Sequence, residues 1–134
     1  MKRVSYNVYA KAVIHKDGKV LLGKKRSDIN HPLKGEWHFF GGAVEENENP
    51  FDTIKREVKE EADLDIKVLD VLDFRNDFIE HNNLHIFFAC DILKGNPKPS
   101  DDISELKWVS ADSLQKYLVK DNPIPSGVMK FLSS

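Results

Sequence analysis

The sequence predicts a layered fold of the α+β or α/β/α type, with a mixed β-sheet. Three observations support this class. The 134 residues are 40% hydrophobic and 31% charged, which suits one folded domain over residues 1–134. The expected strands mostly do not alternate with the helices, and no apolar run approaches the roughly 20 residues that span a bilayer. A small globular domain outside the membrane is therefore expected.

The expected elements follow from composition, periodicity and turn residues. Runs rich in β-branched and aromatic residues indicate strands, and Gly- and Pro-containing stretches indicate loops between them. We expect strands at 6–15, 19–26, 37–40, 66–78, 83–93 and 105–110. We expect helices at 49–62, 111–119 and 126–134, with loops at 27–36 and 94–104 and a break at 120–125.

Charge and cysteine content narrow the class of protein. The net charge of −2 argues against a nucleic-acid polymer as the partner, although a nucleotide whose phosphates meet a metal ion remains compatible. The N-terminus lacks the apolar run of a signal peptide. Cys90 is the only cysteine, so no internal disulfide forms, which fits a reducing cytoplasm. Cys90 lies in the apolar run "LHIFFAC" and is expected to be buried.

The helix expected at 49–62 concentrates acidic residues beside its core face. Asn49 suits the N-cap and Pro50 the first helical position. The expected core stripe is Phe51, Ile54, Val58 and Ala62. Glu57, Glu60 and Glu61 share the neighbouring sector, where they would be partly desolvated. Taken alone, three such glutamates are most often solvated surface residues.

The loop "FFGGAVEENE" before this helix adds a second group of oxygen ligands. Two glycines allow a tight turn and a close approach of the backbone to a ligand, so the carbonyl of Gly42 can bind a hard cation. Glu45 and Glu48 add carboxylates. Oxygen-only sites of this kind favour Mg²⁺ or Mn²⁺, and Mg²⁺ commonly bridges carboxylates to substrate phosphates.

The stretch Gly42 to Leu64 resembles the Nudix box, G-x5-E-x7-R-E-U-x-E-E-x-G-U, in which U is a bulky aliphatic residue. The matching positions are Gly42, Glu48, Arg56, Glu57, Val58, Glu60, Glu61 and Leu64. The flanking stretches "KVLLGKKR" and "ELKWVSADSL" are also similar to this family. Two positions depart from the pattern. Asp63 replaces the glycine that ends the helix, and Phe40 stands where many members have proline.

The resemblance implies a Nudix-type α/β/α sandwich and a metal-dependent pyrophosphohydrolase. Its substrate would be a small nucleotide: a nucleoside diphosphate linked to another moiety, or a damaged nucleoside triphosphate. Carried over by position, Mg²⁺ (or Mn²⁺) would be held by Gly42, Glu57, Glu60 and Glu61. The resemblance also implies that Arg56, together with Glu48, would orient these carboxylates. Homodimers are frequent in the family, so a homodimer is a further expectation.

The general base and the substrate are left open by the sequence. The base is either a box glutamate such as Glu57 or a carboxylate of the later loop, where Asp102 and Glu105 are the candidates. For both loop residues, a role as a solvated surface acid is equally compatible with the sequence. Two substrate markers of the family, a proline near position 79 and a tyrosine near 80–84, are absent.

Further residues are candidates for substrate contacts, and two alternative functions are compatible with this sequence. Phe39, Phe74 and Phe78 are candidates to stack on a base, although aromatic residues at strand positions are more often core residues. Lys24, Lys25 and Arg26 are candidates to contact phosphate, although a solvated surface role is at least as common. His85 alternates with apolar neighbours and is expected to be structural. The alternative functions are a non-enzymatic nucleotide-binding regulatory Nudix-like domain and an isoprenoid-type isomerase. The isomerase needs a catalytic cysteine, which the strand position of Cys90 disfavours.

Overall fold

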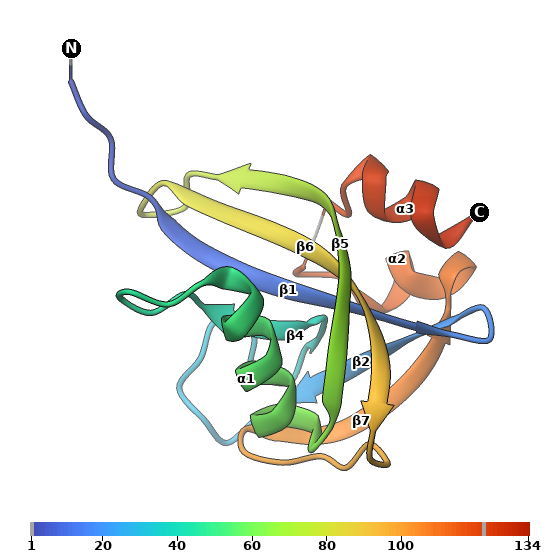
Figure 1. Ribbon diagram of the computed structural model, residues 1–134. Helices are drawn as coiled ribbons and strands as arrows, with labels where there is room; N and C mark the ends of the chain where they lie inside the picture. The colour runs from blue at the N-terminus through green and yellow to red at the C-terminus, as the bar shows by residue number, and fades with distance from the viewer. Residues whose placement is uncertain (1, 122) are drawn as a thin grey trace.

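Seven strands form one mixed sheet with helices against both faces, in a computed structural model that describes residues 2–121 and 123–134 (Figure 1). The strands are β1 Asn7–Lys16, β2 Lys19–Lys25, β3 Trp37–His38, β4 Phe40–Ala43, β5 Asp65–Asp77, β6 Asn83–Lys94 and β7 Ile103–Ser110. The helices are α1 Pro50–Ala62, α2 Leu114–Tyr117 and α3 Ser126–Leu132, and a 3₁₀ turn, η1, covers Ala111–Ser113.

Strand β1 joins the two parts of the sheet. It pairs in parallel with β6 over residues 7–14, and antiparallel with β4 over residues 9–12. At its end it turns into β2, which pairs antiparallel with β3 and with β7. Strand β5 pairs antiparallel with β6 and forms an edge. The parallel β1/β6 pair within otherwise antiparallel pairings makes this a mixed sheet, as the sequence predicts.

Two hydrophobic cores lie on opposite faces of the sheet. Ile54, Val58 and Ala62 of α1 pack against Ala10, Ala12 and Phe88 of β1 and β6. On the other face, the core includes Leu114 and Leu118 around α2, and Val128 and Leu132 of α3. Side chains alternate between the two faces along each strand, so neighbouring residues of β1 serve different cores. The α/β/α arrangement is confirmed.

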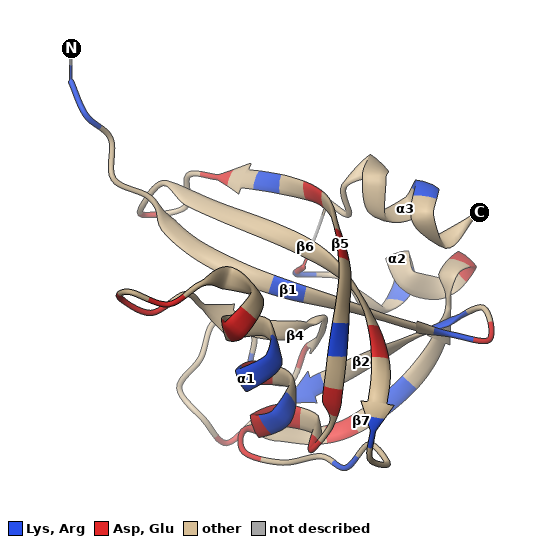
Figure 2. Ribbon diagram, viewed as in Figure 1, with Lys and Arg blue, Asp and Glu red and all other residues tan. Residues whose placement is uncertain are grey.

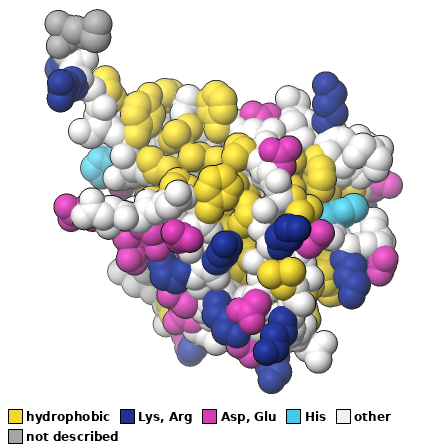
Figure 3. Space-filling view, in the orientation of Figure 1, with side chains coloured by type: hydrophobic (Ala, Val, Ile, Leu, Met, Phe, Trp, Pro, Cys, Tyr) yellow, Lys and Arg dark blue, Asp and Glu magenta, His cyan; other side chains and the backbone are white. Residues whose placement is uncertain are grey.

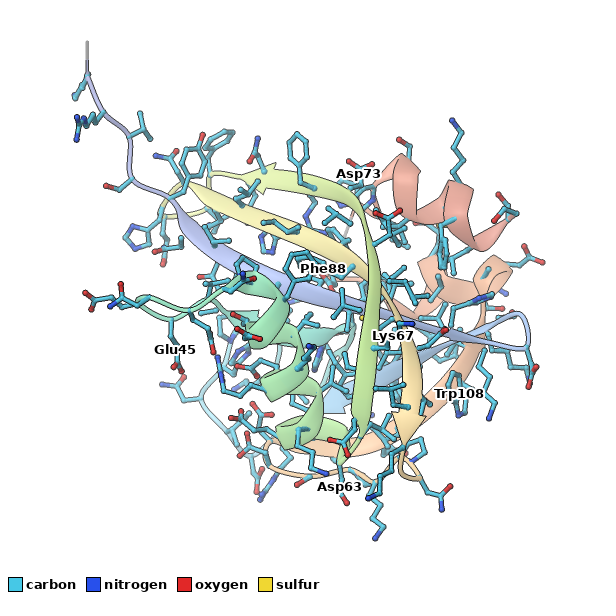
Figure 4. The ribbon with its side chains drawn as sticks, viewed as in Figure 1. Glu45, Asp63, Lys67, Asp73, Phe88 and Trp108 are labelled. Carbon is cyan, nitrogen blue, oxygen red and sulfur yellow. The ribbon has the colours of Figure 1, made fainter. Side chains whose placement is uncertain are left out.

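Helix α1 begins and ends as its sequence predicts. The Asn49 side chain accepts a hydrogen bond from the Phe51 N–H at 2.9 Å, and Pro50 occupies the first turn. Asp63, at the lower end of α1 in Figure 4, has φ 55° and ψ 40°, the left-handed conformation that the family's glycine adopts readily. Phe51 is a correction to the expected core stripe. It lies in the first turn and is 43% exposed, although its ring centroid is 5.3 Å from that of Phe88.

Several boundaries differ from the expectation. The expected strand 37–40 is divided, because His38 pairs with Gly23 of β2 while Phe40 pairs with Ala12 of β1. The expected helix 111–119 is η1 followed by the single turn α2. The expected break at 120–125 includes residue 122, which lies outside the described residues. Among the described residues no helix is long and apolar enough to cross a membrane.

Hydrophobic side chains gather on the upper part of the face shown in Figure 3. Phe74 and Val71 of β5 are 60% and 48% exposed. The expectation that Phe74 is more often a core residue is therefore not met. Cys90 is buried as expected, and burial raises the pKa of its thiol to about 12.

Candidate active site

Strand β4 brings two glycines directly against the acidic side of α1. The Gly41 N–H donates a hydrogen bond to Glu61 Oε1 at 2.9 Å. A Cβ atom added to Gly42 would lie 2.5 Å from Glu57 Oε1, closer than any real side chain tolerates. A glycine at position 42 therefore lets the Glu57 carboxylate lie against the backbone of β4. The loop and the helix meet as the sequence predicts.

Arg56 binds several of the neighbouring carboxylates at once. Its Nε and Nη2 donate to the two oxygens of Glu48 at 2.9 and 3.0 Å, a bidentate pair. Its Nη1 donates to Glu57 at 2.9 Å and to Glu60 at 3.4 Å. Hydrogen bonds from Arg56 and Thr53 lower the pKa of Glu48 to about 2. Figure 2 shows this concentration of basic and acidic residues on α1.

The three box glutamates differ in burial. The side chain of Glu60 is 45% exposed, that of Glu57 16% and that of Glu61 1%. Burial raises the pKa of Glu57, and it raises the pKa of Glu61 to about 7. The sequence placed these residues beside the apolar stripe, and the structure shows that Glu61 is inside the protein. Such a carboxylate needs a cation nearby.

Lys25 supplies the positive charge beside Glu61. Its Nζ donates to Glu61 Oε2 at 3.1 Å and to Asp102 Oδ2 at 2.7 Å, and its side chain is only 8% exposed. Burial lowers the pKa of Lys25, but Glu61 and Asp102 more than compensate, so the net shift is upward. The burial of Lys25 was missed by sequence reasoning, because "KKR" at a strand end has the pattern of a solvated basic run.

The two candidate bases of the later loop lie in different surroundings. Asp102 contacts Lys25, and its Oδ1 is buried with no hydrogen-bond partner among the described residues. Glu105 pairs with Lys24 across β2 and β7 at 3.6 Å, and its side chain is 60% exposed. Asp102 is thus joined to Glu61 through one lysine, whereas the contacts of Glu105 are those of a surface residue.

The residues around Gly42 fit a divalent cation by their chemistry. Glu57, Glu60, Glu61 and the Gly42 carbonyl offer oxygen donors only, which suits Mg²⁺ or Mn²⁺. The close approach of Glu57 to Gly42 brings a carboxylate beside the backbone of the glycine. Within the described part of the chain no three acidic, His or Cys side chains form a ready cluster of metal ligands. Arg56 pairs with Glu57, and Lys25 pairs with Glu61.

A cavity of about 510 Å³ adjoins the carboxylates. Its lining includes Lys25, Gly41 and Gly42, which also belong to the acidic site. Its floor includes Tyr9, Lys11 and His85, which lie on the opposite face of the sheet from α1, because Ala10 and Ala12 face α1. A second depression, of about 400 Å³ beside Trp108 (Figure 4), includes none of the residues of the acidic site.

A buried charge network lies in the wall of the cavity. Asp121 is 2% exposed and accepts a hydrogen bond from Arg75 at 3.2 Å, and Lys11 lies 3.6 Å from it. Its second oxygen lies 3.4 Å from the Phe39 N–H. Phe39 lines the cavity, whereas Phe74 and Phe78, the other two aromatic candidates, are exposed and are not among its described lining residues. Asp121 and Arg75 carry no local sequence signal, since their contact spans 46 residues.

Comparisons with known proteins agree with this geometry. The family model of the NUDIX domain matches residues 6–129. The ADP-ribose pyrophosphatase of Methanocaldococcus jannaschii is 30% identical over 122 residues, which cover 89% of this chain and 70% of that protein. The oxidized purine nucleoside triphosphate hydrolase of Mus musculus is 31% identical over 111 residues, covering 80% and 68%.

Solved structures show the same fold. A MutT NUDIX hydrolase from Burkholderia pseudomallei superposes with a TM-score of 0.75 at 21% identity, over 96% of this chain and 97% of that one. The MutT protein from Methanosarcina mazei Go1 gives a TM-score of 0.76 at 21% identity, over 99% and 94%. The family match and the two curated relatives place this chain among hydrolases that act on phosphoric anhydrides. The chain belongs to the NUDIX family.

Proposed function

We propose that this protein is a metal-dependent pyrophosphohydrolase that cleaves the diphosphate linkage of a small nucleotide. The observation that carries the proposal is the continuity between the acidic site and the cavity. Lys25, Gly41 and Gly42 belong to both, so one ligand can reach from the cavity to the carboxylates around β4. A cavity of about 510 Å³ falls in the range of small-molecule sites.

The roles follow from the contacts of each side chain. Glu57, Glu60, Glu61 and the Gly42 carbonyl would hold Mg²⁺ or Mn²⁺, and Arg56 would keep the carboxylates oriented. When bound, the metal neutralises charge on the phosphoryl oxygens and lowers the pKa of a water molecule. Glu57, or Asp102 held by Lys25, would take a proton from the attacking water. Glu105 is the weaker candidate because its side chain faces solvent.

Two substrate classes are supported by relatives. The M. jannaschii relative is an ADP-ribose pyrophosphatase, and the mouse relative hydrolyses oxidized purine nucleoside triphosphates. Both substrates carry a purine nucleoside and a phosphoanhydride. The absence of proline near position 79 weakens the first class, since Ile79 stands there. We therefore expect the substrate to be a purine nucleotide. The test includes both ADP-ribose and nucleoside triphosphates.

A screen of nucleotide substrates with Mg²⁺ and Mn²⁺, with identified products, tests this function. ADP-ribose cleavage would release AMP, whereas triphosphate cleavage would release a monophosphate and pyrophosphate. The variants Glu60→Gln and Glu61→Gln should lose at least about 100-fold in kcat while remaining folded. Glu46→Gln is the matched control, because Glu46 is exposed in the same region and should keep full activity. Full activity of Glu60→Gln would refute the metal assignment.

The alternative of a non-enzymatic regulatory domain has its own outcome in this screen. Tight nucleotide binding without turnover of any compound would support it. The remaining expectations stay predictions: one catalytic domain over residues 1–134, a homodimer, a cytoplasmic location and no nucleic-acid polymer as partner. Sedimentation of the purified protein tests the homodimer directly.

A further inference from the structure

Two mostly buried cations share a single buried carboxylate in the wall of the cavity. Arg75 Nη2 donates a hydrogen bond to Asp121 Oδ1 at 3.2 Å, and Lys11 Nζ lies 3.6 Å from the same oxygen. The side chains of Lys11 and Arg75 are each 11% exposed, and that of Asp121 is 2% exposed. Two positive charges and one negative charge leave an excess positive charge in surroundings where an uncompensated charge is costly.

Lys11 is the cation of this cluster that remains available to a ligand. Arg75 is held on a second side, because its Nη1 donates to the Pro123 carbonyl oxygen at 3.0 Å. The distance of 3.6 Å from Lys11 Nζ to Asp121 is too long for a hydrogen bond. Nζ is nevertheless not one of the side-chain atoms that are both closed off from solvent and without a hydrogen-bond partner. It therefore keeps contact with solvent.

The solvent that Lys11 contacts is that of the cavity. Its neighbours Ala10 and Ala12 pack toward α1, so the Lys11 side chain points to the other face of the sheet, where it lines the cavity. Burial lowers the pKa of His38 and of His85, and the positive charge of Lys11 lowers both further. Both histidines line the same cavity. The ammonium group thus lies close to other residues of the cavity wall.

The other acids of the cavity do not neutralise Lys11. Asp77 accepts a hydrogen bond from Asn83 at 2.7 Å and lies 2.7 Å from His85 Nε2, and Glu80 is exposed. Among the described residues, Asp121 is the only acid that forms an ion pair with Lys11. The excess charge therefore makes this part of the cavity complementary to an anionic group of a ligand.

The position of Lys11 on β1 indicates which anionic group this is. Lys11 pairs directly with Gly41 of β4, whose N–H donates to Glu61 Oε1 at 2.9 Å. Gly41 and Gly42 border both the cavity and the carboxylates of α1. A ligand that reaches the carboxylates with its phosphates would pass Lys11 at this end of the cavity.

We propose that Lys11 is a substrate-binding residue whose ammonium group pairs with a phosphate group of the nucleotide from the cavity side of the sheet. This inference rests on the proposed function, since it assigns the ligand of the cavity to the nucleotide class. A lysine ammonium binds phosphate as a point charge. Lys11 would thus bind the phosphates on one side of β4 without a metal ion, while the carboxylates of α1 lie on the other side.

Binding of ADP and of adenosine in the presence of EDTA, measured by calorimetry, tests the inference. Without divalent metal we expect ADP to bind the wild-type protein about fivefold more tightly than adenosine, or better. This ratio should fall toward one in Lys11→Met and should be retained in Lys11→Arg, which keeps the charge. A ratio of one or no binding of ADP in the wild-type protein, or an unchanged ratio in Lys11→Met, would overturn the inference.

Two variants with the same change of charge are the matched controls. Lys120 lines the same cavity but is exposed, and Lys24 pairs with Glu105 at the surface and is not a lining residue of the cavity. The ratio should be unchanged in Lys120→Met and in Lys24→Met. A fall as large as in Lys11→Met would show a general effect of net charge and would contradict the assignment to Lys11.

Thermal unfolding separates this role from a structural one. Arg75 stays paired with Asp121 when Lys11 is replaced, so Lys11→Met and Lys11→Gln should fold with a Tm within about 4 °C of the wild-type protein. If Lys11→Met does not fold, Lys11→Gln gives the binding ratio. A fall of about 10 °C or more in both variants would show that Asp121 needs Lys11 as its counter-ion, and the inference would be overturned.

The binding ratio is independent of turnover. If no compound is hydrolysed but ADP binds selectively through Lys11, the proposed function fails and this inference stands. If hydrolysis is confirmed but the ratio is one, or is unchanged in Lys11→Met, the inference alone fails.

Discussion

Replacement of Lys25 by Met tests whether this lysine is the counter-ion of a buried carboxylate. The substitution keeps the length of the side chain and removes the ammonium that lies 2.7 Å from Asp102 and 3.1 Å from Glu61. Removing one partner of a buried pair costs roughly 3–5 kcal/mol. Glu61 can take up a proton, because its pKa is already raised to about 7 by burial, and this limits the cost. We therefore expect a loss of about 3 kcal/mol.

The loss is measurable as a free energy of unfolding in urea, followed by tryptophan fluorescence. For a chain of 134 residues, about 3 kcal/mol corresponds to a fall in Tm of roughly 10 °C. Lys24→Met is the matched control, because Lys24 is 36% exposed and its pair with Glu105 is at the surface, so a change below about 0.5 kcal/mol is expected. Equal stability of the Lys25 variant and the wild-type protein would refute the counter-ion role.

Four further predictions concern individual positions. Gly42→Ala should weaken Mg²⁺ binding, measured by calorimetry, about tenfold or more, because the new Cβ would lie 2.5 Å from the Glu57 carboxylate. Unchanged Mg²⁺ affinity in this variant would contradict the prediction. Asp63→Gly should raise the free energy of unfolding by about 0.5–1 kcal/mol, since φ is 55° there, whereas Asp63→Ala should lower it. Cys90, 1% exposed, should not react with a thiol reagent at pH 8 until the protein unfolds. The folded-state pKa of His38, about 4, lies below the ordinary 6.5, so its stabilising contribution is present above pH 6.5 and is lost as pH falls toward 4. Between pH 7.5 and pH 5 the wild-type protein should therefore lose about 2 kcal/mol more than His38→Gln in urea unfolding, and an equal loss would show that the ring is not buried as a neutral group.

The local parts of the fold could be predicted from the sequence because their causes are local. Asn49, Pro50 and the apolar spacing define α1, and the family pattern locates its end at Asp63. Alternation and turn residues located β5 and β6 to within a residue or two. The division of residues 37–43 into β3 and β4 could not be predicted, because it depends on which neighbouring strand each half meets.

The site could be predicted only where it lies on one continuous stretch of chain. The box from Gly42 to Leu64 carries its own spacing, and the structure brings its glycines and glutamates together. Lys25 was not recognisable as buried, because its partner Glu61 is 36 residues away. His85 was expected to be structural from its apolar neighbours, and its position in a strand is confirmed. The alternation of His85 with apolar neighbours could not show that the face of β6 that carries His85 lines a cavity.

The separation of the acidic site from the cavity explains why the box does not identify the substrate. The carboxylates belong to α1, on one face of the sheet, whereas Tyr9 and His85 line the cavity on the other face. Lys25, Gly41 and Gly42 join the two sides, and a side chain at either glycine would meet the Ala10 carbonyl or the Glu57 carboxylate. If the cavity holds the nucleoside as proposed, substitutions there would change which nucleotide binds while α1 keeps its geometry. Under the proposed function, ligand preference would depend on the residues of the cavity wall, whereas the phosphoanhydride chemistry would depend on α1.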